Sequence, residues 1–461
     1  KKKKSKKDKK RKPYTPDDPE MRLRMRYYYK LSEKTEDKTY FILPAHVIPV
    51  TTKTSDGLMI FNIWTTMMGS SLLAMPWGLM GCGWILGFLL IFLWGSMCGY
   101  TCLLIVQHGT RLGQTDFCYV SQVILGPWAK YAVWGSSIGI LFGSLIAFSV
   151  LMSEIFFEIV NGIHLFINES WLDEYSDAVP DVVEGNWKWN SKYAAFIVFL
   201  MVFPVSNLNN FDIFVRLNSF GVLSVVYTLF FLVISSYAFV GAEPSEVDYV
   251  GNGFLVMAAL LTVSFFMHSV ILPLLSTAKY PEHNERNLII AYFLVACCYS
   301  IVGISGAFAF GPDYSELPQI ILDVYDLNNP WAFLSRCFFF GQLFCVYPLV
   351  LLLVRVQFFD VVKLENLKIS VKMKVAILNF SIVFIGALFG AFYPNFGRVL
   401  SVTGGICGLL LVFILPVACH LKYLSETQTK TRFYISCGVH GTIVFLGAVA
   451  GFGQFIYPGL V

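Results

Sequence analysis

Charged side chains are scarce in this sequence. Asp, Glu, Lys and Arg make up 14% of its 461 residues, whereas about a quarter is usual for a soluble globular protein. Hydrophobic residues account for 56%, and the mean hydropathy is +0.63. This shortage of charge excludes an ordinary soluble domain and argues against nucleic-acid binding. The composition is typical of an all-α polytopic membrane protein.

Motifs that carry enzyme chemistry are also missing. The sequence has no Gly-rich phosphate loop ending in Lys, no HExxH zinc motif and no nucleophile elbow. We therefore expect neither an enzyme nor a protein with a bound cofactor. Eleven cysteines are present, but nearly all lie in apolar runs and none lies in a long polar loop. A disulfide framework is therefore not indicated.

Long apolar runs fill most of the chain after residue 57. A helix that crosses the hydrocarbon core needs about 20 mostly apolar residues. By this criterion we expect eleven membrane-spanning helices, at 58–80, 82–106, 131–166, 192–206, 217–240, 251–277, 288–310, 331–358, 375–392, 398–420 and 435–457. The chain then divides into a tail, 1–57, that is mostly disordered, and a transmembrane transporter domain, 58–461.

Basic residues are distributed unevenly between the expected loops. Residues 1–12 contain ten Lys or Arg, and further basic residues gather in alternate loops, while acidic residues gather in the others. Because Lys and Arg accumulate on the cytosolic side, we expect a cytosolic N-terminus and, with an odd number of spans, a luminal or external C-terminus. The sequon Asn168-Glu169-Ser170 falls in a loop on the non-cytosolic side, so Asn168 is a candidate glycosylation site.

Two of the expected spans are interrupted by helix-weakening residues. The 58–80 segment carries a Gly-Ser-Ser triplet followed by Pro76, and the 251–277 segment carries His268 and then Pro273. The breaks lie five spans apart, as expected for a five-plus-five inverted repeat with one extra helix, and such breaks mark midplane binding sites. The alternatives are that each break is only a packing kink, and that His268 makes an ordinary interhelical hydrogen bond.

Several strings in this chain resemble the sodium-coupled neutral amino acid transporters, and in particular a lysosomal, arginine-sensing branch of that family. They include IWTTMMGSS at 63–71 with PWG at 76–78, VLMS at 150–153, FFMH at 265–268 and YPN at 393–395. The likeness extends over most of the chain. It implies an amino acid/polyamine/organocation-type fold and transport by alternating access.

The resemblance also implies where the amino acid binds. The family binds its substrate along the unwound part of the first span. Free backbone N–H groups there can donate hydrogen bonds to a carboxylate, and free carbonyls can accept them from an ammonium group. His268 is added because an ionisable group within the bilayer is by default a functional candidate. The candidate substrate-binding residues are Thr66, Met67, Met68, Gly69, Ser70, Ser71 and His268.

The tail carries a short apolar and aromatic patch within the range 25–49. It resembles the segment with which that branch docks onto the Ragulator–Rag GTPase complex, and a disordered segment of this kind typically folds on a partner. Alternatively, the segment lies on lipid or plugs the cytosolic mouth of the transporter. The matching contact positions are Met25, Tyr28, Leu31, Pro44 and Pro49.

Two positions depart from the family at the expected sodium site. The family usually has Asn where this chain has Thr65, and Thr where this chain has Cys345. Sodium is a hard cation that prefers oxygen ligands, and a thiol is a poor substitute. We therefore expect sodium coupling to be weak or absent.

Three functions fit these observations. The first is a lysosomal transporter and sensor of arginine, leucine and other amino acids that signals to the Rag GTPase–Ragulator–mTORC1 pathway through its tail. The second is a plain neutral or cationic amino-acid permease without a signalling role. The third is a scaffold in which transport is vestigial.

Overall fold

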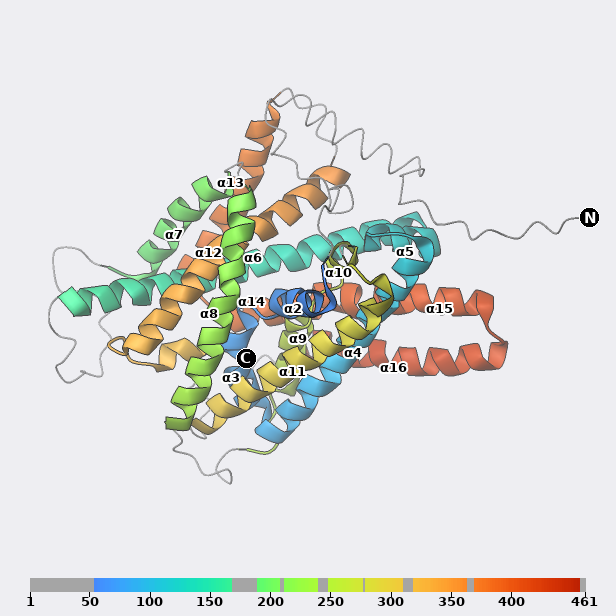
Figure 1. The fold of residues 1–461 in the computed structure, drawn as a ribbon, viewed down its shortest axis with the longest axis horizontal. Coiled ribbons are helices and arrows are strands. Elements are labelled where there is room, and N and C mark those ends of the chain that lie inside the picture. Colours follow the sequence, from blue (N-terminus) through green and yellow to red (C-terminus); the bar gives the residue numbers. More distant parts are fainter. Residues whose placement is uncertain are drawn as a thin grey trace, which may run out of the picture.

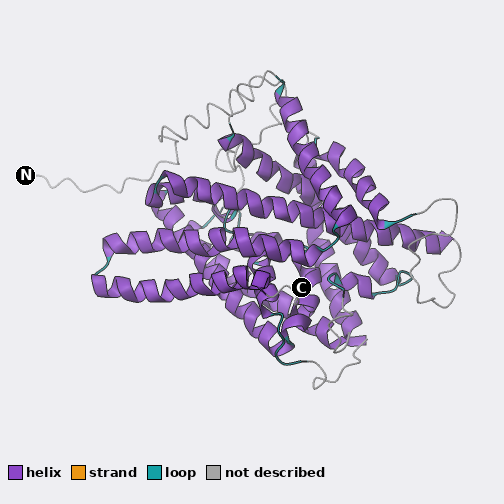
Figure 2. Cartoon of the chain, turned by 180° about the vertical axis from the view of Figure 1, so that it is seen from behind, coloured by secondary structure: helices purple, strands orange, loops and turns teal. Residues whose placement is uncertain are grey.

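The computed structural model describes residues 54–167, 189–207, 211–238, 248–276, 278–309, 318–362 and 369–456. Apart from one isolated bridge between Thr54 and Ala278, these residues form helices joined by turns and short loops (Figure 2). Six of the sequence-based candidates lie outside the described residues, namely Met25, Tyr28, Leu31, Pro44, Pro49 and Asn168.

The first half of the chain begins with a short pair of helices and continues with longer ones (Figure 1). The elements are α2 (Asp56–Met67), α3 (Ser71–Cys82), α4 (Trp84–Leu112), α5 (Phe117–Leu125), α6 (Pro127–Ile167), α7 (Ser191–Ser206) and α8 (Phe211–Ala238).

The second half opens with another pair of short helices. The elements are α9 (Phe254–Ser264), α10 (Ile271–Leu275), η1 (Pro281–His283), α11 (Asn284–Ala309), η3 (Ile321–Val324), α12 (Pro330–Val361), α13 (Val371–Phe392), α14 (Phe396–Thr403), the π-helical segment η4 (Gly404–Ile414), α15 (Leu415–Thr427) and α16 (Lys430–Ile456).

Helices fall within each of the eleven ranges expected from the sequence. Seven of the described helices are long and apolar enough to cross a membrane, and the bent pair α2–α3 makes an eighth candidate. Helix α6 is the longest: its 41 residues extend about 60 Å, twice the thickness of the hydrocarbon core. It is therefore too long for one perpendicular crossing.

The two short pairs lie near the middle of the bundle (Figure 1); α4 packs against α3, α9 and α10, and α11 packs against α2 and α3. Glycines allow the central helices to approach closely. A Cβ atom at Gly78 of α3 would lie 2.7 Å from the sulfur of Met257, and one at Gly306 of α11 would lie 2.6 Å from Cβ of Pro76. Small residues serve the same purpose in membrane proteins generally, where close packing replaces the hydrophobic effect.

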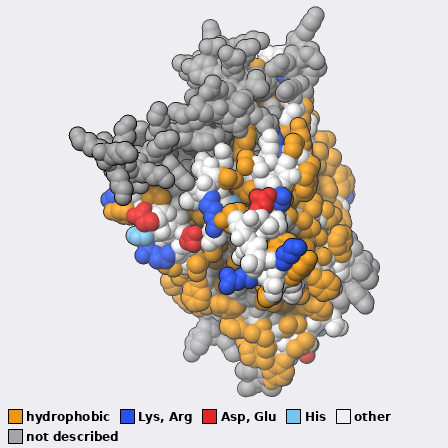
Figure 3. All heavy atoms as spheres, turned by 90° about the vertical axis from the view of Figure 1, so that its right-hand side faces the viewer, with side chains coloured by type: hydrophobic (Ala, Val, Ile, Leu, Met, Phe, Trp, Pro, Cys, Tyr) orange, Lys and Arg blue, Asp and Glu red, His pale blue; other side chains and the backbone are white. Residues whose placement is uncertain are grey.

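The outer faces are apolar, as expected for contact with lipid. Large hydrophobic side chains on α16 are exposed, among them Tyr434, Phe445 and Phe452. Figure 3 shows the end of the molecule where α15 and α16 meet: hydrophobic side chains cover the flanks, and charged ones gather near the middle of the face. All eleven cysteines are unpaired.

Candidate functional site

The first helix break lies between α2 and α3. Residues 68–70 leave the helix, and the two halves meet at an angle of 62°. On the α2 side, the hydroxyls of Thr65 and Thr66 donate to the carbonyls four residues earlier, at 2.8 and 2.7 Å. Hydroxyl bonds of this kind bend helices, and Gly69 then makes continuation of the helix unfavourable.

The second break is longer and separates α9 from α10. Helix α9 ends at Ser264, and six residues, 265–270, intervene before α10 begins at Ile271. The hydroxyl of Ser264 donates to the carbonyl of Leu260 at 2.9 Å, so it bends the end of α9 as the threonines bend the end of α2.

Two buried tyrosines of α11 donate hydrogen bonds to three of the carbonyl groups at the breaks. A carbonyl oxygen has two lone pairs, so each of the three can still accept a second hydrogen bond. The Tyr299 hydroxyl lies 2.9 Å from the Met67 oxygen at the end of α2 and 3.3 Å from the Ser264 oxygen at the end of α9. Tyr292 donates to the Phe265 oxygen at 3.0 Å. Tyr299 therefore joins the two broken helices through one hydroxyl group. The only sequence signal for this role is that a buried Tyr needs a hydrogen-bond partner.

Backbone donors remain free on the other side of the first break. Within the described residues, the N–H groups of Gly69 and Ser70 have no hydrogen-bond partner. They lie at the start of α3, where the helix dipole favours a negative charge. The carbonyl end of α2 and the unpaired N–H groups at the start of α3 thus lie within a few residues of each other.

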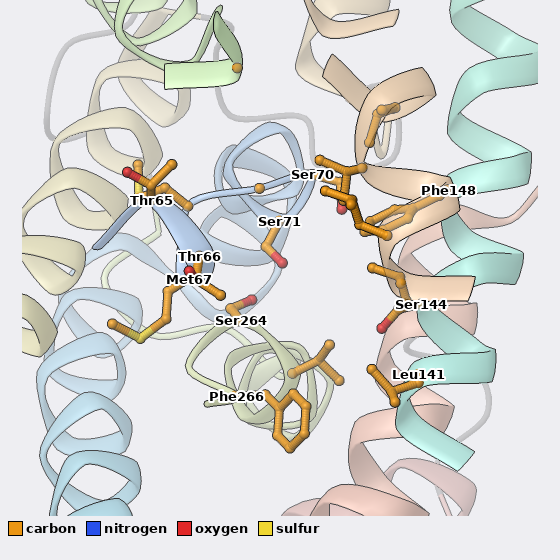
Figure 4. A pocket seen from close by; sticks show the side chains of 18 of the residues that line it. Thr65, Thr66, Met67, Ser70, Ser71, Leu141, Ser144, Phe148, Ser264 and Phe266 are labelled. Carbon is orange, nitrogen blue, oxygen red and sulfur yellow. The ribbon is translucent and has the colours of Figure 1, made fainter. Parts of the chain in front are cut away.

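A cavity of about 310 Å³ lies at these breaks. This volume is at the lower end of the ~300–1,000 Å³ typical of small-molecule sites. Figure 4 shows Ser70, Ser71 and Ser264 on one side of it and Phe148, Ser144 and Leu141 of α6 on the other. The remaining lining residues are Thr65, Thr66, Met67, Met68, Gly69, Gly221, Val263, Phe266, Val270, Gln342, Leu343, Val346, Leu349, Val350, Leu353 and Leu400.

The cavity lining is mostly apolar, and its polar groups are uncharged. Among the described residues around the cavity are hydroxyl groups, backbone groups, apolar side chains and the single amide of Gln342, but no Asp, Glu, Lys, Arg or His. Within the described residues no cluster of His, Cys, Asp or Glu could hold a metal ion. A net-neutral zwitterion matches such a surface better than an ion does, because a buried charge needs a partner.

The structure brings together most of the residues singled out in the sequence. Thr65, Thr66, Met67, Met68, Gly69, Ser70 and Ser71 all line the cavity. Cys345, the other candidate sodium position, does not line it.

His268 also does not line the cavity. It is fully buried, with Nε2 2.9 Å from the Thr101 hydroxyl of α4, and its ring stacks on Phe266, which does line the cavity. The Thr101 hydroxyl also lies 3.1 Å from the carbonyls of Met97 and Cys98, in its own helix. This arrangement corresponds to the interhelical hydrogen bond that we had considered as the alternative.

Sequence reasoning missed the lining residues outside the first break. Leu141, Ser144 and Phe148 come from the middle of α6, and Gln342 comes from α12. Each lies in an apolar run without a distinguishing motif. Whether its side chain faces the cavity depends on how the helix is rotated about its axis. The spacing of 141, 144 and 148 does fit one face of a helix, but other faces of α6 carry similar residues.

Comparisons with known proteins agree with this geometry. The family model described as "Transmembrane amino acid transporter protein" matches residues 52–457. "Sodium-coupled neutral amino acid transporter 9 homolog" of Caenorhabditis elegans is 28% identical over 503 residues, covering 94% of this chain and 80% of the relative. "Neutral amino acid transporter 9" of Rattus norvegicus is 28% identical over 504 residues, covering 94% and 89%.

A more distant relative is "Putative sodium-coupled neutral amino acid transporter 10" of Xenopus laevis, which is 25% identical and matches 83% of this chain but 36% of its own length. Among solved structures, MhsT in complex with L-phenylalanine aligns with a TM-score of 0.54 at 13% identity, covering 86% of this chain and 97% of that one. This likeness shows the fold alone, that of a helical polytopic transporter. The predicted resemblance to sodium-coupled neutral amino acid transporters is thereby confirmed, and the chain belongs to the transmembrane amino acid transporter protein family.

Proposed function

We propose that this protein binds an amino acid in the cavity at its two helix breaks and carries it across the membrane by alternating access. One observation carries the proposal: the free N–H groups at the start of α3 and the carbonyl ends of α2 and α9 lie around the same cavity. Those two sets of groups suit the carboxylate and the ammonium group that every α-amino acid has.

The side chain of the substrate then occupies the part of the cavity between the breaks and helices α6 and α12. Its walls there are Leu141 and Phe148 on one helix and Leu343 and Val346 on the other. Leucine fits this surface directly. Arginine, the second substrate we propose, would place its apolar stem on the same walls. The names of the relatives, neutral amino acid transporters, favour leucine and other neutral amino acids as substrates.

For the membrane domain we keep the arrangement expected from the sequence. It has eleven spans, of which the first ten form a five-plus-five inverted repeat with broken helices one and six. The correspondence between the α2–α3 and α9–α10 breaks supports this layout. Sodium coupling in this proposal is weak or absent, because the thiol of Cys345 is a poor substitute for the oxygen ligands that sodium prefers. Replacing sodium by choline should leave amino-acid flux largely unchanged, and a collapse of flux would refute this.

We further propose that the protein acts at the lysosomal membrane, with its N-terminus cytosolic and its C-terminus luminal. There its tail docks onto the Ragulator–Rag GTPase complex and reports amino-acid sufficiency to mTORC1. This proposal rests on the resemblance of the tail sequence. Replacing Tyr28 and Leu31 by Ala should abolish recovery of the Rag complex and leave transport intact. Unchanged recovery would favour a plain permease.

The test of transport is flux in proteoliposomes that contain the purified protein. Radiolabelled leucine and arginine should show saturable uptake, and Ser70→Trp should abolish it by filling the cavity. Gly441→Ala is the control, because a Cβ atom at that exposed α16 position meets nothing within 4 Å. Normal flux in Ser70→Trp would mean that the site is misplaced. Saturable binding without flux would point to the scaffold or sensor function.

A further inference from the structure

Gln342 is the one amide side chain among the described residues that line the cavity. It lies on α12, is 9% exposed, and its Oε1 atom has no hydrogen-bond partner. The other cavity-lining residues of α12 are all apolar, namely Leu343, Val346, Leu349, Val350 and Leu353. Gln342 is therefore an isolated polar group in a hydrophobic wall.

An unpaired amide oxygen in such a wall is unfavourable for the empty protein. Buried polar groups are nearly always hydrogen-bonded, and each exception calls for an explanation. A leucine or methionine would pack equally well at this position and would leave no acceptor unsatisfied. A ligand that donates a hydrogen bond to Oε1 explains the exception, because it satisfies the oxygen when it enters.

The remaining lining indicates what kind of ligand group this is. The carboxylate and ammonium of an amino acid are already accounted for at the breaks, so the donor must belong to the side chain. We propose that Gln342 is a specificity-determining residue, whose amide oxygen accepts a hydrogen bond from an N–H or O–H group on the side chain of the substrate. The inference rests on the proposed function, since it places an amino acid in the same cavity.

The proposal predicts that the site distinguishes substrates whose side chains have similar shapes but different polarity. Glutamine and methionine have similar length, as asparagine and leucine have similar shape, but only the amides donate a hydrogen bond. A site with a buried acceptor disfavours the analogue that leaves the acceptor unpaired. Gln342 should therefore raise the affinity for the amide of each pair relative to its apolar counterpart.

Competition against bound radiolabelled leucine on the purified full-length protein tests this without depending on flux. Gln342→Met removes the acceptor at nearly constant volume. It should reduce the preference for glutamine over methionine by about tenfold, the ratio expected for one buried hydrogen bond. Binding of leucine should persist.

Gln357→Met is the matched control. Gln357 is on the same helix and also has an unpaired Oε1 atom, but it does not line the cavity. The Gln357→Met variant should keep the wild-type preference for glutamine over methionine. Gln342→Glu supplies a second readout: it retains an acceptor and adds a negative charge, so arginine should compete more strongly than in the wild type, an effect that a merely structural role would not produce.

The outcomes separate the two proposals. If leucine binds and the glutamine-to-methionine ratio is the same in Gln342→Met as in the wild type, the assignment of Gln342 is wrong and the transport site stands. If arginine does not gain in Gln342→Glu although leucine still binds, the carboxylate does not face the substrate and the assignment is again wrong. If the wild type binds no amino acid, the proposed function fails, and this inference fails with it.

Discussion

Tyr299 connects the two halves of the site through a single hydroxyl group. Its oxygen is within hydrogen-bonding distance of the last carbonyl of α2 and the last carbonyl of α9, and the side chain is fully buried. Its single proton is shared between the two acceptors. Because the backbone groups of both breaks define the cavity, a residue that fixes their separation positions the site without lining the cavity.

Replacing Tyr299 by Phe should therefore weaken substrate binding as well as stability. The change leaves two buried carbonyls without this donor, at a cost of about 1–3 kcal/mol. We expect a lower unfolding temperature and a raised Kd for leucine. Tyr227→Phe is the control, since the Tyr227 hydroxyl donates to the Trp331 carbonyl at 3.1 Å at an exposed position. If Tyr299→Phe and Tyr227→Phe have the same Kd for leucine, the two breaks hold their positions without the Tyr299 hydroxyl.

At the same scale, the sequence predicted one part of the cavity and missed the other. Seven consecutive residues, 65–71, were identifiable because Thr, Gly and Ser in the middle of an apolar span disturb the helix itself. Ser144 and Gln342 lie inside continuous helices, so only the rotation of α6 and α12 about their axes places them at the cavity. For His268 the polar side chain indicated a contact with the substrate. In the structure it is hydrogen-bonded to Thr101 in the core and does not line the cavity.

At the scale of elements, close backbone contacts hold the central helices together. The π-helical segment η4 begins at Gly404, and a Cβ atom there would clash with the carbonyl oxygen of Ala259 on α9. A second glycine, Gly143 of α6, faces Thr403 with equally little space. The sequence predicted a plain helix across 398–420, because nothing in its hydropathy distinguishes a π-helical segment from an α-helix.

Gly404→Ala should consequently destabilise the membrane domain. The neighbouring atom is backbone and cannot turn away as a side chain can, so α9 and η4 must separate, and overpacking of this kind costs about 1–3 kcal/mol. We expect a clear fall in the unfolding temperature of the purified protein. Gly438→Ala on α16 should have little effect, because its Cβ atom meets nothing within 4 Å. Equal unfolding temperatures for the two variants would contradict the packing argument.

Over the whole molecule, hydropathy predicted the helical segments well, because a span must be long and apolar whatever its neighbours are. The short helix α5, Phe117–Leu125, was not predicted, since nine residues cannot cross a membrane. How distant segments pair was also beyond prediction. At the start of the described chain, the backbone N–H of Lys279 donates to the Thr54 oxygen at 2.8 Å, so the residues that lead into α2 are hydrogen-bonded to the segment after α10.

Asp56, the first residue of α2, strengthens this attachment. Its carboxylate accepts hydrogen bonds from His283 of η1 at 2.7 Å and, in the first turn of α11, from Arg286 at 2.9 Å and Asn287 at 3.1 Å. A single exposed ion pair contributes about 0–1 kcal/mol, but three donors on one carboxylate act together. The network holds the outer end of α2 against α11, whose Tyr299 holds the inner end. Helix α2 is thus fixed at both ends by one neighbour.

Asp56→Ala should release the outer end of α2 and open the cavity toward that side of the membrane. The measurement is the rate at which a membrane-impermeant maleimide labels Ser70→Cys in proteoliposomes, corrected for the native cysteines with the parent protein. We expect several-fold faster labelling from the side where α2 begins. Glu426→Ala is the control, because it removes an exposed pair with Lys422, 2.9 Å apart on α15. If Ser70→Cys is labelled at the same rate in the Asp56→Ala and Glu426→Ala variants, the Asp56 network stabilises the fold but does not restrict access to the cavity. Tyr299 alone would then hold α2 in place.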